Sequence, residues 1–319
     1  MQQSCADLAV FLRLFGNYSA PINYSYEESL IMFRKLVLAA SVAVSFTAAV
    51  EAKEPLQLKV YNADGNSFNV TSTVISGETE AVVVDAGFTR ADAYRIAANV
   101  LDTGKTLKTI LVSNADPDYY FGVEVLKEIF PEADVVAPPA VLEHIKAKLP
   151  FKVEFWGPKM GANAPRNPVV PAALKGNFIT VDGEKLEVRG MQGELAHRPY
   201  VWVPSLRAIV GNVGVLADMH VWMADTQKQS ERDAWVAQLD EMKALHPAIV
   251  VPGHMLPDSD MDVSAIDFTR TYLKRFEEEA KDAKNADALM QAMEQAYPKL
   301  ETGIALEISA KVEKGEMKW

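Results

Sequence analysis

Short apolar runs that stop abruptly at polar turns are the feature that most restricts how this chain can fold. The segments Ala81–Val84 and Thr109–Val112 are rich in Val and Ile, and they run directly into "DAG" and "SNADPDYYFG". A third run, Ala248–Val251, ends at "PGH". Continuous apolar runs bounded by turn residues predict strands that are buried on both faces. The loops that follow such strands are where α/β folds place binding and catalytic side chains.

Segments with helical periodicity alternate with the predicted strands. The periodicity fades between Phe151 and Val181, where Pro and Gly accumulate, and this predicts an irregular insertion beside a site. The alternation predicts an α/β fold in two halves, each of which ends a buried strand in a polar turn. The other predicted elements are the strands Phe68–Ile75, Lys185–Arg189, Tyr200–Val203 and Arg207–Val210, and the helices Arg90–Leu101, Val123–Phe130, Ala140–Lys148 and Glu231–Leu245.

The N-terminal region has the pattern of a secretory signal peptide at residues 32–52. Arg34 and Lys35 precede an apolar stretch, and small residues on either side of Glu51 predict a cleavage site after Ala52. The apolar stretch is shorter than the roughly 20 residues that a membrane span needs, although a retained anchor is the alternative. We therefore expect a periplasmic or secreted bacterial protein with no stable membrane insertion after cleavage.

Composition narrows the classes of function that are open to the mature chain. Residues 1–31 show no helical or strand periodicity and are predicted to be an extension upstream of the true start. The only cysteine, Cys5, lies in that segment, so the mature chain is expected to form no disulfide and offer no Cys ligand. The net charge of −11, without a cluster of Lys and Arg, argues against a nucleic-acid partner. A small-molecule substrate is the expected partner.

Three motifs, in this order along the chain, resemble the metallo-β-lactamase superfamily. They are "VVVDAG", "SNADPDYYFG" and "VVPGH", and the resemblance covers about Leu56 to Pro257. It implies a four-layer αβ/βα sandwich at residues 53–258, with a metal site along one edge of two packed sheets. Apolar residues at helical spacing predict a C-terminal helical extension at residues 259–319, which would cap the sandwich, cover the cleft or form a homodimer contact.

The resemblance also implies which side chains form the site, and several depart from the family pattern. In place of the family's H-x-H-x-D-H motif, this sequence carries Asn114, Asp116, Asp118 and Tyr119. The family's next ligand, a histidine ahead of a β-hairpin, corresponds to Glu194, with His197 as the alternative, and the bridging aspartate corresponds to Asn212. The implied set is Asp116, Asp118, Glu194 and His254 as metal ligands, Asn114, His197, Asn212 and His220 as further ligands or residues lining the site, and Asp85 as a supporting carboxylate.

The implied ligands favour one divalent metal ion. Asp116, Asp118 and Glu194 would bring three carboxylates together, and like charges at short range destabilise a fold unless a cation is present. Oxygen ligands suit Mn²⁺ or Fe²⁺ better than tetrahedral Zn²⁺, with a single zinc ion as the alternative. Asn212 removes the anion that would bridge two metals. A metal-free site, in which neutral side chains bond to Asp118 and to backbone turns, is the competing interpretation.

A bound metal would make the chain a hydrolase. The ion would lower the pKa of a bound water and polarise a small ester, lactone, thioester or amide, while Asp118 orients the nucleophile. The Tyr119 phenol would donate to an oxyanion in place of a second metal. The alternative function is a catalytically inactive small-molecule-binding protein that has lost its metal.

Overall fold

The computed structural model describes residues 54–319. The predicted signal peptide at residues 32–52, the upstream extension at residues 1–31 and Cys5 lie outside the described residues. The described residues form one compact unit, which includes the C-terminal extension. Within the described part, no helix has both the length and the apolar character needed to cross a bilayer.

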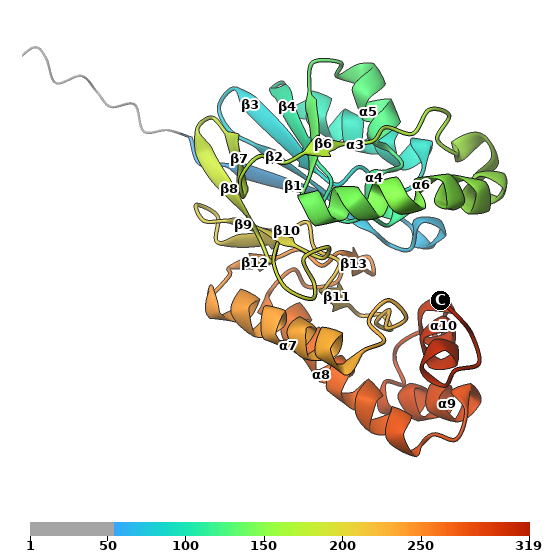
Figure 1. Cartoon of the computed structure of the whole chain (residues 1–319). Coiled ribbons are helices and arrows are strands. Elements are labelled where there is room, and N and C mark those ends of the chain that lie inside the picture. Colours follow the sequence, from blue (N-terminus) through green and yellow to red (C-terminus); the bar gives the residue numbers. More distant parts are fainter. Residues whose placement is uncertain (1–53) are drawn as a thin grey trace, which may run out of the picture. The chain divides into compact units, whose positions relative to one another are not determined.

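Two sheets form the centre of the structure (Figure 1). The first has the strand order β1-β2-β3-β4-β5-β6, in which β1 to β3 pair antiparallel and β3 to β6 pair parallel. The second has the order β12-β10-β9-β8-β7, and β11 pairs separately with β13. The strands are β1 Gln57–Asn62, β2 Thr71–Ser76, β3 Glu80–Val84, β4 Thr106–Leu111, β5 Asp134–Ala137, β6 Ala172–Ala173, β7 Phe178–Val181, β8 Glu184–Arg189, β9 Tyr200–Val203, β10 Ala208–Val210, β11 Leu216–Ala217, β12 Ile249–Val250 and β13 His254–Met255.

Helices cover the outer face of each sheet, so the layers follow the order helix, sheet, sheet, helix (Figure 1). One buried apolar cluster joins the first sheet to α3, α5 and α6, and another joins the second sheet to α7 and α8. A third cluster fills the space between the two sheets. The four-layer sandwich predicted from the sequence is confirmed. The helices are α3 Arg90–Thr103, α4 Pro117–Tyr120, α5 Val123–Ile129, α6 Pro139–Met160, α7 Gln229–Ala244, α8 Val263–Asp282, α9 Ala286–Ala296 and α10 Ile304–Glu313.

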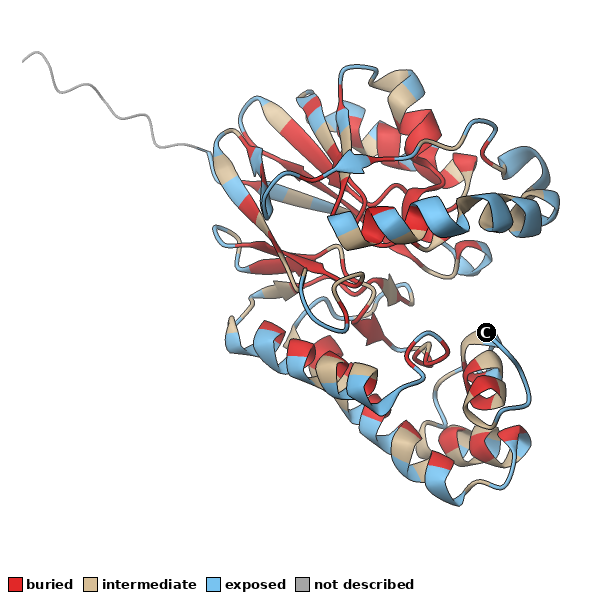
Figure 2. Cartoon of the chain, in the orientation of Figure 1, coloured by how far each residue is buried: buried red, intermediate tan, exposed pale blue. Residues whose placement is uncertain are grey.

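Strand β3 shows why the apolar runs have no polar face. Successive side chains along a strand point to opposite faces of the sheet. Val82 and Val84 lie in the cluster between the sheets, whereas Ala81 and Val83 lie in the cluster beneath the helices. Both faces are covered, and Figure 2 accordingly shows buried residues along the central strands. The prediction of strands buried on both faces is confirmed.

Helix α6 is longer than the sequence pattern indicated. It continues to Met160, so the irregular insertion predicted from Phe151 is wrong over its first part. Pro150 lies inside the helix, where a proline removes one backbone hydrogen bond. The packing of Trp156 edge-on against Phe88, with ring centroids 5.4 Å apart, helps to offset that loss. Strand β7 also falls within the segment that was expected to be irregular.

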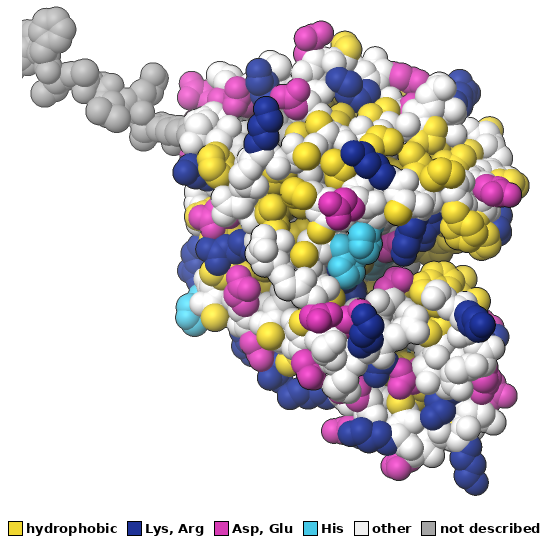
Figure 3. All heavy atoms as spheres, in the orientation of Figure 1, with side chains coloured by type: hydrophobic (Ala, Val, Ile, Leu, Met, Phe, Trp, Pro, Cys, Tyr) yellow, Lys and Arg dark blue, Asp and Glu magenta, His cyan; other side chains and the backbone are white. Residues whose placement is uncertain are grey.

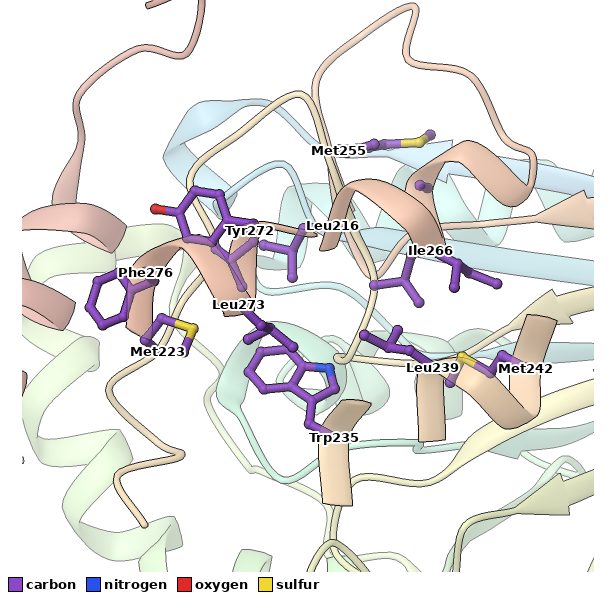
Figure 4. Packing of buried hydrophobic residues seen from close by; sticks show 14 of the residues in the cluster. Leu216, Met223, Trp235, Leu239, Met242, Met255, Ile266, Tyr272, Leu273 and Phe276 are labelled. Atoms are coloured by element: carbon purple, nitrogen blue, oxygen red, sulfur yellow. The ribbon is translucent and has the colours of Figure 1, made fainter. Parts of the chain in front are cut away.

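Helices α8, α9 and α10 confirm the predicted C-terminal helices. The side chains of Asp262 and Asn285 accept hydrogen bonds from backbone N–H groups in the first turns of α8 and α9. Figure 4 shows Trp235 of α7 beside Leu273 of α8, within one buried cluster. The extension therefore shares its core with the second sheet. A homodimer contact through these helices stays a prediction.

The loops that follow β10 and β12 approach each other closely at Gly253. A Cβ atom at this position would collide with the backbone oxygen of Asn212 and lie 2.6 Å from the Tyr119 hydroxyl. We expect Gly253→Ala to lower the free energy of unfolding in urea by about 2 kcal/mol, because the backbone must shift. Gly65→Ala is the matched control, since a Cβ there meets no atom within 4 Å. Equal urea midpoints for the two variants would contradict this packing.

Candidate functional site

The polar turns after β3, β4 and β12 meet at one edge of the sandwich. Asp85, directly after β3, accepts hydrogen bonds from the backbone N–H and the hydroxyl of Ser113, each 2.7 Å long. Tyr119, in the loop after β4, approaches Gly253 in the loop after β12. Asp85 is 1% exposed, and burial raises its pKa to about 7. The hydrogen bonds of this carboxyl group therefore hold the turn after β3 against the turn after β4.

The loop after β4 places Asp118 and Tyr119 on the short helix α4. The side-chain oxygen of Asn114 accepts a hydrogen bond of 2.8 Å from the backbone N–H of Asp116, which forms an Asx turn. A proline then begins the helix, as its fixed φ favours at a first helical position. The Asp116 carboxylate faces Lys152 of α6 at 3.5 Å. Asn114 thus shapes the backbone that presents the two carboxyl groups.

Asp118 and His254 are two of the expected ligands that do lie in contact. The His254 Nε2 is 3.5 Å from the Asp118 Oδ2. The His254 Nδ1 is 2.9 Å from the backbone oxygen of Phe68. A carbonyl oxygen can only accept, so we assign the proton to Nδ1 and a lone pair to Nε2. Burial lowers the pKa of His254 to about 4 and raises that of Asp118 well above its ordinary value, which favours the neutral form of each side chain.

Tyr119 carries a buried hydroxyl without a hydrogen-bond partner among the described residues. The residue is 1% exposed, and its ring meets the His254 ring edge-on with centroids 5.6 Å apart. An unsatisfied buried polar group costs about 1–3 kcal/mol. Such a group in a native structure calls for an explanation, and a water molecule or a ligand that bonds to the hydroxyl is one.

The remaining expected ligands do not join Asp118 and His254 in one centre. Glu194 is exposed, because the turn that carries it buries Leu195 and Arg198 instead. Within residues 54–319, no group of three or more His, Cys, Asp or Glu side chains is arranged to hold a metal. The expected centre of Asp116, Asp118, Glu194 and His254 is therefore not assembled among the described residues, and metal binding by these four side chains stays a prediction.

His197, the alternative third ligand, forms a pair with a helix residue. Its ring stacks on that of His144 in α6, with centroids 4.6 Å apart and planes 17° from parallel. Burial lowers the pKa of His197 to about 4, and the neighbouring His144 adds to this effect. The pair brings the loop before β9 against α6 beside the site.

Asn212 and His220 have structural roles. The Asn212 side chain donates to the backbone oxygen of Val251 and accepts from the N–H of Val215, each over 2.9 Å. His220 is 2% exposed, and its Nδ1 lies 2.8 Å from the Tyr272 hydroxyl of α8. The apolar segment around His220 carries the residue into the core beside α8, and a role for it in lining the site stays a prediction.

Arg198 is the residue of the site that the sequence analysis missed. It is 6% exposed, and its guanidinium carbon lies 4.2 Å from the centre of the Trp235 ring. Burial raises the pKa of Tyr119, and the positive charge of Arg198 opposes this rise. Burial lowers the pKa of His254, and the positive charge of Arg198 lowers it further. A signal was present in the sequence, since Arg198 directly precedes the apolar strand segment "PYVWV".

A fixed positive charge in this cluster does not suit the metal that the resemblance implies. Metal ligands bind in their deprotonated forms, and their negative charge attracts the cation. Here Asn114 and Asn212, at two of the implied positions, carry no negative charge and bond to the backbone, and the buried Arg198 guanidinium adds a positive charge. The residues present therefore do not fit the family's metal.

The surface beside the site is bordered by α6 and by the C-terminal end of the chain. Asp225 accepts the indole N–H of Trp222 on one oxygen, over 2.6 Å, and that of Trp319 on the other, over 2.8 Å. The charge of Asp225 acts on Arg198. Figure 3 shows this face hollowed between α6 and the C-terminal helices, with histidine side chains nearby and with basic and acidic side chains interspersed.

The raised pKa of Asp85 makes the free energy of unfolding decrease as the pH rises. The carboxyl titrates near pH 4 in the unfolded chain and at about 7 in the folded protein. Its contribution to stability is complete below pH 4 and is lost as the pH rises through 7, because the unfolded state releases its proton first. Between pH 6 and 8, the unfolding free energy of the wild type should fall by about 1 kcal/mol more than that of Asp85→Asn. Urea titrations test this, and parallel pH profiles would contradict the raised pKa.

Comparison with known proteins places the chain in a family. The model of the metallo-beta-lactamase superfamily matches residues 65–254. A metallo-beta-lactamase family protein from Thermus thermophilus superposes with a TM-score of 0.58 at 15% identity, over 82% of this chain and 91% of that one. VMB-1, in its structure at pH 5.5, gives 0.51 at 16% identity, over 70% and 94%. No curated protein matches the sequence. The chain belongs to the metallo-β-lactamase superfamily.

Proposed function

We propose that this chain is a small-molecule-binding protein of the metallo-β-lactamase superfamily that works without a metal ion. The buried guanidinium of Arg198 carries the proposal, because it stacks on Trp235 and its Nη1 atom has no hydrogen-bond partner among the described residues. It supplies within the chain a positive charge of the kind that a metal would bring. We also propose, from the sequence alone, that the mature protein is periplasmic or secreted and has no nucleic-acid partner.

Metal-dependent hydrolysis, the function implied by the resemblance, has less support in the arrangement of the side chains. Catalytic zinc sites use three protein ligands, whereas only Asp118 and His254 lie in contact among the four expected ligands. A ligand-binding role makes no demand for a third ligand. It also accounts for the buried Tyr119 hydroxyl, which is available to bond to a ligand.

Hydrolysis without a metal is the second candidate, and the free lone pair of His254 favours it. The Nε2 atom would accept a proton from water, while the Tyr119 hydroxyl would donate to the oxyanion that forms on a small ester, lactone, thioester or amide. The lowered pKa of His254 makes it a weak base at neutral pH. We therefore place this function second.

Metal uptake is the direct test of the proposal. The full chain, equilibrated with Zn²⁺, Mn²⁺ or Fe²⁺ and then desalted, should retain no more metal than an Asp118→Ala/His254→Ala double variant, because the remaining donors do not converge. Elemental mass spectrometry gives the metal-to-protein ratio. About one equivalent in the wild type and none in the variant would overturn the proposal in favour of a mononuclear hydrolase.

Esterase assays test the second candidate separately. With p-nitrophenyl acetate and a simple lactone, both in the presence of a chelator, we expect the wild type and His254→Ala to give the same background rate. His246→Ala is the matched control, since this histidine lies in the turn after α7. A wild-type rate that falls about 100-fold in His254→Ala alone would favour metal-free hydrolysis.

A further inference from the structure

Arg198 is a buried charge, and one nitrogen of its guanidinium has no hydrogen-bond partner among the described residues. The residue is 6% exposed, and its Nη1 atom has no partner within the described part of the chain. The guanidinium stacks on the Trp235 ring at 4.2 Å, which satisfies none of its in-plane N–H groups. Burying an unpaired charge is among the most destabilising arrangements in proteins. An acceptor from outside the chain would remove this penalty.

The carboxyl groups closest to this site have other partners. Both oxygens of Asp225 accept indole N–H groups. Asp116 faces Lys152 at 3.5 Å, and Asp118 faces a histidine at the same distance. Asp225 and Asp116 act on Arg198 only as charges at longer range. The guanidinium is thus left without a carboxylate from its own chain among the described residues.

Tyr119 supplies a second buried donor in the same cluster. Its hydroxyl has no partner among the described residues. Neighbouring backbone groups link the two donors. Trp235, on which the guanidinium stacks, donates to the Gly214 oxygen over 2.8 Å. The adjacent Val215 oxygen accepts from the N–H of Gly253 over 2.8 Å, and the Tyr119 hydroxyl lies beside Gly253. A guanidinium fork and a hydroxyl are both donors, and together they suit an acceptor that carries negative charge.

We infer that Arg198 and Tyr119 hold the oxyanion group, a carboxylate or a phosphate, of the small molecule that this protein binds. The inference rests on the proposed function, since it assigns a ligand class to the same metal-free site. Arginine binds both groups through parallel N–H donors, so the shared chemistry is an oxygen anion with at least two acceptor atoms. Trp235, beneath the guanidinium, holds the fork in place and provides a fluorescent reporter.

Calorimetric titration of the full chain tests the inference with three probes at one ionic strength. Benzoate represents a carboxylate, inorganic phosphate represents a phosphate group, and benzamide is the neutral counterpart of benzoate. We expect the wild type to bind benzoate or phosphate, with a change in Trp fluorescence, and not to bind benzamide. Binding of benzoate alone assigns a carboxylate, and binding of phosphate alone assigns a phosphate.

Substitutions at Arg198 and Tyr119 test whether these residues bind the anion. Arg198→Met should weaken anion binding at least about 10-fold, and Tyr119→Phe about 3-fold to 10-fold, because each removes donors to a charged acceptor. Arg189→Met is the matched control, since it removes the same charge from a separate hollow lined by Glu187, Gly190 and Glu241. It should bind as the wild type does.

Thermal unfolding without ligand separates a binding role for Arg198 from a structural one. Removal of an unpaired buried charge should raise the unfolding temperature of Arg198→Met by about 2 °C or more, even though anion binding is lost. A fall in unfolding temperature together with unchanged anion binding would assign Arg198 to packing and overturn the inference.

Two outcomes distinguish this inference from the proposed function. If the wild type takes up no metal but binds neither anion, or if Arg198→Met binds them equally well, the oxyanion assignment is wrong and the metal-free site stands. If the wild type holds about one equivalent of metal at Asp118 and His254, the proposed function itself fails, whatever the anions do.

Discussion

The face-to-face packing of the two sheets is the constraint on which the rest of the structure depends. Side chains of Val82 and Val84 meet those of Val201 and Val210 in the cluster between the sheets. Once both sheets are buried against each other, the backbone groups at the strand ends must find partners in the turns that follow. Asp85 meets part of this demand by accepting from two groups of Ser113. The polar edge is therefore a consequence of the apolar centre.

This arrangement explains how the fold can persist while the chemistry of its edge changes. The sheets are held by apolar contacts and backbone pairing, which are independent of the side chains at the ends of the loops. Asn114 and Asn212 occupy expected metal-site positions, yet here their side chains bond to the backbone and stabilise turns. A buried arginine then supplies a fixed positive charge. Under the proposed function, such a site does not activate water on a metal but can still recognise an anion.

Much of the fold could be predicted from the sequence because its signals are local. Short apolar runs before "DAG" and "PGH" predict buried strands. Strand β9 lies at Tyr200–Val203, as expected. The extent of α6 could not be predicted, because Pro150 and Pro158 argue against a helix and only tertiary packing keeps it intact. That packing includes Trp156 against Phe88, a contact between residues far apart in the chain.

The site was harder to predict than the fold, because its members are defined by burial. Asp118 and His254 follow recognisable motifs, and they do meet. Glu194 was assigned by register to a turn that in fact directs Arg198 inward. A register argument counts residues along a loop, whereas the direction of each side chain depends on which apolar neighbours the loop must bury. His220 illustrates the same point, since its apolar neighbours place it in the core beside Tyr272.

The central claim is that Arg198, and not a metal, is the positive charge of this site. Diffraction at the zinc absorption edge, from crystals of the full chain grown with both zinc and benzoate, tests it most directly. The account predicts no anomalous peak between Asp118 and His254, and carboxylate density on the Arg198 guanidinium within hydrogen-bonding distance of the Tyr119 hydroxyl. An anomalous peak bound by Asp118 and His254, with Arg198 turned away from it, would contradict the account.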